Sequence, residues 1–104
     1  MLSKPVTQSF LDYCQSLVLR ASTIATQKCV RSFTETDFRN DLMKITIPTL
    51  IIHGDSDKIV PIEVSSDRTS EMISHATYIR YNDAPHGLYF TDKDKLNEDL
   101  MRFI

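Results

Sequence analysis

Glycine is scarce in this 104-residue sequence, which contains only Gly54 and Gly87. Glycine serves tight turns and places where another backbone or a ligand approaches closely. Phosphate-binding loops of the dinucleotide-binding and P-loop kinds need several glycines within a short stretch, so neither kind of loop is encoded here. Both glycines lie directly after a histidine, His53 and His86. The chemistry is therefore to be sought around these two positions.

Cysteine is also scarce, and the sequence lacks a large excess of charge of one sign and long apolar runs. Cys14 and Cys29 match no metal-binding or redox spacing, which predicts small core residues in a reduced, cytoplasmic setting. The net charge of −2 and pI of about 5.8 indicate no nucleic-acid partner and no membrane-binding patch. No apolar run approaches the roughly 20 residues of a membrane span. Charged and polar residues interrupt the N-terminal apolar stretch, so no signal peptide is expected.

The order of apolar residues predicts helices followed by an α/β region. Helical spacing predicts one helix over about 9–20, a second beginning at Ser22 or Thr23, and a short helical turn before residue 45. The apolar run in "TLIIH" predicts a strand that is buried on both faces. After it come a helix over 63–74, a β-branched and aromatic strand over 76–81 and a closing helix over 92–104. We therefore expect a helical segment, 1–45, and a βαβα segment, 46–104, with parallel strands.

Asp57 and His86 each follow one of the two predicted strands by a few residues. In parallel sheets the carboxyl ends of strands lie at the same edge, and functional residues gather there. A carboxylate that orients an imidazole and stabilises its cation is the orienting half of a Ser-His-Asp triad. The chain order, acid before histidine, is that of α/β-hydrolases. Each residue alone has a structural explanation, a capped turn or a surface histidine, but the pair favours catalysis.

Other chemistries fit the same stretch less well. His53, Asp55 and Asp57 alternate in a way that suggests a metal site, but they straddle a glycine and a turn. The D-x-D start of a calcium loop fails, because Ile59 and Val60 stand where a ligand and a glycine are required. Ser56 lies in a G-x-S-x-K stretch, yet no helix follows it and it precedes the acid by one residue. It is not expected to be a nucleophile.

The stretches "IPTLIIHGDSDKIVP", "YNDAPHGL" and "LNEDLMRFI" resemble the C-terminal part of α/β-hydrolases, nearest the cofactor-free haloperoxidase and aryl-esterase branch. That family has its acid in a G-x-x-D pattern with a proline four residues later. Gly54, Asp57 and Pro61 match the pattern, so the resemblance gives the acid role to Asp57 and the base role to His86. The stretch "ASTIATQKCVRSFTETDFRNDLMKI" resembles the end of a helical cap. The resemblance implies an ester substrate and no cofactor or metal.

One part of the family pattern, the nucleophile elbow, is missing from this sequence. The family nucleophile lies on a G-x-S-x-G elbow, and two glycines at 54 and 87 cannot form one. We therefore expect a C-terminal fragment of a serine hydrolase, from a truncated or split reading frame, that is inactive alone. The alternative is a binding or assembly module, in which open sheet edges pair with a separate N-terminal half or with a second copy.

Overall fold

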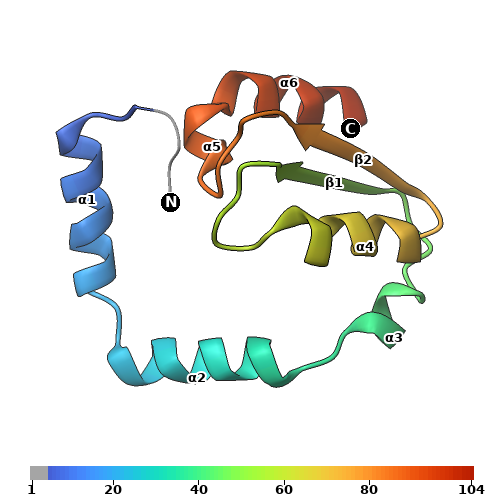
Figure 1. Ribbon diagram of the computed structural model, residues 1–104, viewed down its shortest axis with the longest axis horizontal. Coiled ribbons are helices and arrows are strands. Elements are labelled where there is room, and N and C mark those ends of the chain that lie inside the picture. Colours follow the sequence, from blue (N-terminus) through green and yellow to red (C-terminus); the bar gives the residue numbers. More distant parts are fainter. Residues whose placement is uncertain (1–4) are drawn as a thin grey trace. The chain divides into compact units, whose positions relative to one another are not determined.

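The computed structural model describes residues 5–104 and divides into two units, one of Val6–Phe38 and one of Pro5 together with Arg39–Ile104 (Figure 1). The first unit consists of α1 (Gln8–Leu19) and α2 (Thr23–Glu35). The second unit holds both strands and the remaining helices. The cap-like role expected for 1–45 and the core role expected for 46–104 stay predictions. Residues 1–4 of the first segment lie outside the described residues.

Local capping explains where the two long N-terminal helices begin. The Thr7 side chain accepts a hydrogen bond from the Phe10 N–H at 3.3 Å, and Ser22 caps α2 through the Ala25 N–H at 3.3 Å. Such caps satisfy N–H groups that have no partner within the helix. Both helices lie within a residue or two of the predicted positions.

The prediction that both cysteines are core residues was wrong. Cys14 is only partly buried and Cys29 is exposed. The reason is that neither α1 nor α2 has a buried residue, so their apolar stripes pack into no core. Helical spacing identifies an apolar face but does not supply the layer that covers it.

The two predicted strands pair as expected. In the described part of the chain, β1 (Thr49–Gly54) and β2 (Ala76–Tyr81) form a parallel sheet in which Gly54 lies opposite Tyr81. Figure 1 shows α4 (Ser66–Met72) on one side of this sheet and α6 (Lys93–Phe103) on the other. The alternation of side chains along β2 explains both contacts. Tyr78 Oη donates to Asp67 on α4 at 2.7 Å, whereas Tyr81 Oη donates to Asp99 on α6 at 2.5 Å.

The region between the strands differs from the predicted single helix over 63–74. A short 3-10 turn, η1 (Ile62–Val64), precedes α4, and Ser65 separates them with φ −127° and ψ −93°. These angles lie outside the helical region, so the backbone changes direction there.

After β2, a short helix, α5 (Leu88–Thr91), also precedes α6. These breaks set where α4 and α6 begin.

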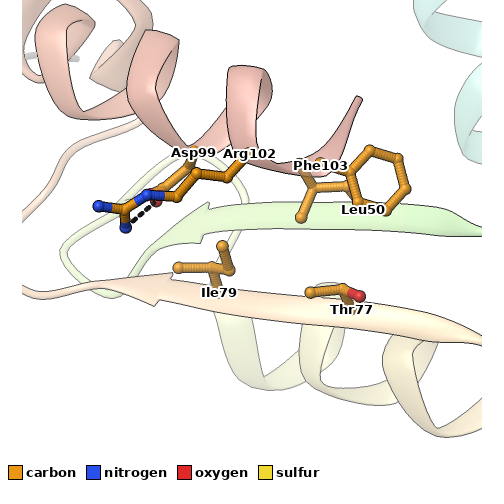
Figure 2. Close-up of a pocket in the computed structure, with 6 residues that line it drawn as sticks. All are labelled: Leu50, Thr77, Ile79, Asp99, Arg102 and Phe103. Atoms are coloured by element: carbon orange, nitrogen blue, oxygen red, sulfur yellow. Dashed lines mark ion pairs between the residues drawn. The ribbon is translucent and has the colours of Figure 1, made fainter.

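The sheet is less covered than the prediction of a doubly buried strand required, and that prediction was wrong. The residues of β1 are only partly buried up to its last position, Gly54. Figure 2 shows an open groove between α6 and the sheet. Two strands and short helices cannot cover both faces of an apolar strand. The groove is lined by Leu50, Thr77, Ile79, Asp99, Arg102 and Phe103.

Tyr81 is the largest buried side chain of the second unit, at 1% exposure. Burial first, and then the hydrogen bond to the Asp99 carboxylate, raise its pKa. We expect Tyr81→Phe to lower the free energy of unfolding by about 1–2 kcal/mol, because Asp99 loses its phenol donor. Urea denaturation checks this, with Tyr13→Phe in the first unit as a control at an exposed tyrosine. Equal losses in both variants would contradict the assigned contact.

Candidate active site

The loops that follow the two strands are held against each other. The Ser56 N–H donates to the Ala84 carbonyl at 3.0 Å, and the Asp83 N–H donates to Asp55 Oδ1 at 2.7 Å. At Gly54 the backbones approach so closely that a Cβ atom would lie 2.1 Å from the Ala84 oxygen. Only glycine fits this crossing. The contacts fix the first loop relative to the second, which holds His86.

Asp57 lies at the centre of these loops and its carboxylate is fully used. Its Oδ1 accepts the backbone N–H groups of Ile59 at 2.8 Å and Val60 at 3.0 Å. Its Oδ2 lies 2.8 Å from His86 Nδ1. The residue is 8% exposed. A buried carboxylate must be hydrogen-bonded to remain charged, and these donors meet that need.

The donors also determine the charge of Asp57. Burial alone would raise its pKa, but the hydrogen bonds from Val60, His86 and Ile59 outweigh burial and lower the pKa from 3.8 to about 2. Asp57 is therefore ionised at neutral pH and can only accept hydrogen bonds. The nitrogen of His86 that faces it must then be the protonated one. When the ring is neutral, its Nε2 keeps a free lone pair that can take a proton.

His86 stands at the edge of a small groove. Its side chain is 48% exposed, in contrast to 3% for the Asp57 side chain. The groove has a volume of about 270 Å³, and besides His86 its lining consists of Ile52, His53, Asp57, Leu88 and Tyr89. A buried carboxylate thus contacts an imidazole that reaches an open groove with apolar lining residues. Such an arrangement can transfer a proton between His86 and a group that enters the groove.

His53 is the functional candidate that sequence reasoning missed. Its Nε2 lies 3.1 Å from Asp57 Oδ2 and 3.0 Å from the Val60 oxygen, and its Nδ1 lies 2.6 Å from Ser66 Oγ. The sequence suggested His53 only as a metal ligand, together with Asp55 and Asp57, and that interpretation fitted poorly. Within residues 5–104, no group of three or more His, Cys, Asp or Glu side chains is placed to hold a metal ion. Its position at the end of the strand, before a turn into the acid, was the available signal.

The lowered pKa of Asp57 predicts a pH dependence of stability. A depressed pKa stabilises the fold above the unfolded value of 3.8, and this contribution disappears as the pH falls toward about 2. The shift corresponds to roughly 2 kcal/mol. We expect urea denaturation between pH 5 and pH 2 to show a steeper loss of stability for the wild type than for Asp57→Asn. Parallel curves for the two chains would contradict the assigned pKa.

Comparison with known proteins identifies a matching family and similar proteins. The family described as the alpha/beta hydrolase fold matches residues 14–93. A non-heme chloroperoxidase of Streptomyces lividans is 33% identical over 99 residues, covering 95% of this chain and 36% of that protein. A bifunctional esterase/perhydrolase of Acinetobacter calcoaceticus is 40% identical over 73 residues, or 70% of this chain and 26% of its own length.

Solved structures agree with the sequence matches. A bromoperoxidase from Bacillus anthracis has a TM-score of 0.91 at 44% identity, covering 94% of this chain and 36% of that chain. An esterase from Exiguobacterium antarcticum has a TM-score of 0.92 at 25% identity, covering 98% and 38% respectively. The chain thus spans between about a quarter and little more than a third of the length of these relatives. Within residues 5–104, no helix is both long and apolar enough to cross a membrane.

Proposed function

The chain belongs to the α/β-hydrolase family, and from that premise we propose that Asp57 and His86 are the acid and base of a Ser-Asp-His triad. The observation that supports this most is the 2.8 Å hydrogen bond between a buried, ionised carboxylate and a half-exposed imidazole. It lies beyond the carboxyl ends of neighbouring parallel strands, where such folds hold their chemistry. Esterase and haloperoxidase relatives support the same class of reaction.

In this proposal His86 Nε2 accepts the proton of a serine hydroxyl as that oxygen attacks an ester carbonyl. The imidazolium that forms is stabilised by Asp57, whose low pKa keeps it charged throughout. His86 then protonates the departing alkoxide and later takes a proton from the water that releases the acid. Small carboxylic esters are the proposed substrates, in line with the esterase names of the relatives.

The serine of this triad is proposed to lie outside these 104 residues. The sequence has no G-x-S-x-G elbow. Ser56 is held in the acid turn, where its backbone N–H bonds to Ala84. The backbone donors that would stabilise the tetrahedral intermediate belong to the same elbow and to an early strand, and they often give the largest catalytic effect. The chain alone is therefore proposed to be inactive.

Ester hydrolysis by the isolated chain tests this proposal. We expect purified protein to hydrolyse p-nitrophenyl acetate no faster than its His86→Ala variant at the same concentration, since an imidazole without a nucleophile and an oxyanion site gives only background rates. A His75→Ala variant controls for hydrolysis by any exposed histidine. A wild-type rate clearly above that of His86→Ala, and unaffected in His75→Ala, would overturn the proposed inactivity.

A second candidate function is that of an assembly module. It is favoured by the partly buried strand β1 and by apolar side chains of the second unit that remain exposed. A sheet of two strands has open edges that can pair with another chain. Size-exclusion chromatography with light scattering, over a wide concentration range, distinguishes the cases. This candidate predicts a mass that rises with concentration, and a folded monomer throughout would contradict it. The exposed set includes Val64, Leu100, Phe103 and Ile104.

A further inference from the structure

We propose that His53 is a positioning residue, which sets the orientation of the Asp57 carboxylate and through it the tautomer of His86. This inference rests on the proposed function, because it assigns a role to His53 within the same acid–base pair. It concerns a residue that touches the acid and not the reacting atoms.

The contacts of His53 determine its tautomer. Its Nε2 lies 3.0 Å from the Val60 carbonyl oxygen and 3.1 Å from Asp57 Oδ2, and both of these atoms can only accept. Nε2 must therefore hold the proton and share it between them. The Ser66 hydroxyl, at 2.6 Å, then donates to Nδ1. A neutral ring in this tautomer satisfies all three contacts.

His53 is also the more rigid of the two imidazoles that meet Asp57. Its side chain is 12% exposed, whereas that of His86 is 48% exposed. His53 belongs to β1 and is tied to α4 by Ser66, while His86 lies on the loop after β2. Two side chains donate to the same oxygen of one carboxylate, and the one with less freedom determines where that oxygen points.

The Asp57 carboxylate needs this second side-chain donor. Its Oδ1 is anchored by the Ile59 and Val60 N–H groups, but Oδ2 can swing about that anchor by rotation of the carboxylate. The Nε2–H of His53 fixes Oδ2 where His86 Nδ1 meets it at 2.8 Å. Without His53, the oxygen has a wider range of positions. His86 is then expected to lose the fixed Nδ1–H form that leaves Nε2 free as the base.

Two substitutions at this position separate the donor from the bulk of the ring. The amide nitrogen of His53→Gln can reach the place of Nε2 and donate to Asp57, whereas the shorter side chain of His53→Asn places its amide near Nδ1 and Ser66. Both variants are neutral and polar. Ser66→Ala is a third, milder variant, which keeps the ring but removes the donor that fixes its tautomer.

The test is the tautomer of His86 in the full chain, measured from the ring nitrogen shifts of 15N-labelled protein at a pH where the ring is neutral. We expect the wild type and His53→Gln to hold His86 as the Nδ1–H form. In His53→Asn, the ratio of this form to the Nε2–H form should fall about tenfold, as for the loss of one hydrogen bond to a charged group. Ser66→Ala should give a smaller fall in the same direction.

The possible results separate this inference from the function on which it rests. An unchanged His86 ratio in a folded His53→Asn chain overturns the positioning role and leaves the Asp57–His86 pair intact. A wild-type His86 in the Nε2–H form would contradict the pair itself, and with it the proposed function. Loss of dispersed amide signals in His53→Asn but not in His53→Gln would make His53 a residue of the fold, which also contradicts the positioning role.

Discussion

Replacing His86 by alanine should remove nearly all ester hydrolysis once this chain is joined to the part of a relative that precedes the matched region. The Bacillus anthracis bromoperoxidase is suitable, because its matched region superposes with a TM-score of 0.91. In the resulting chimera a serine would attack only when His86 takes its proton. We expect kcat/KM for a small activated ester to fall roughly 10⁴-fold or more, as for other triads that lose their base.

The chimera offers a matched control and a second substitution in the triad. His75→Ala removes an exposed histidine just before β2 and should leave kcat/KM close to that of the parent chimera. Asp57→Asn should lower kcat strongly, because a neutral amide neither enforces the Nδ1–H tautomer nor stabilises the imidazolium. Retention of most of the activity in His86→Ala would show that the base lies elsewhere.

Replacing Gly54 by alanine should lower the free energy of unfolding by more than Tyr81→Phe does. The new Cβ would lie 2.1 Å from the Ala84 oxygen and 2.6 Å from its carbonyl carbon. These are backbone atoms of Ala84, which is fully buried, and they cannot move aside as a flexible side chain would. We expect the free energy of unfolding to fall by about 3 kcal/mol, the upper part of the range for overpacking, measured by urea denaturation.

A double variant shows whether the backbone contact is the cause. Ala84→Gly removes the Ala84 Cβ, which the new atom would meet at 3.0 Å, but not the carbonyl at 2.1 Å. Stability should therefore not recover in Gly54→Ala with Ala84→Gly. The displaced loop should also alter the His86 ring signals, since His86 follows Ala84 by two residues. Wild-type stability in Gly54→Ala would contradict the close crossing of the two loops.

Much of this arrangement could be predicted from local patterns. The apolar run that ends at His53 and the aromatic strand that ends at Tyr81 each identify themselves within a few residues. Because parallel strands end at one edge of the sheet, Asp57 and His86 are expected to lie close together. In the structure, Asp57 Oδ2 lies 2.8 Å from His86 Nδ1. The family resemblance added the roles of the two residues, which spacing alone does not give.

The features that were missed depend on tertiary contacts. The helical pattern of the sequence does not encode the break at Ser65 or the separate short helix α5. His53 looked like a failed metal ligand because its partners, Val60 and Ser66, are spread along the following turn and helix. The incomplete burial of β1 could not be read from its apolar sequence, since burial depends on which layers are present.

The most direct test of the central claim is the site at which a fluorophosphonate labels the chimera, read by mass spectrometry of the digested protein. The proposed triad predicts a single labelled serine in the part contributed by the relative. It also predicts that labelling becomes at least roughly 10³-fold slower in His86→Ala, because the serine is no longer activated. Labelling of Ser56, or an equal labelling rate in His86→Ala, would contradict the assignment of Asp57 and His86 as the acid and base of the triad.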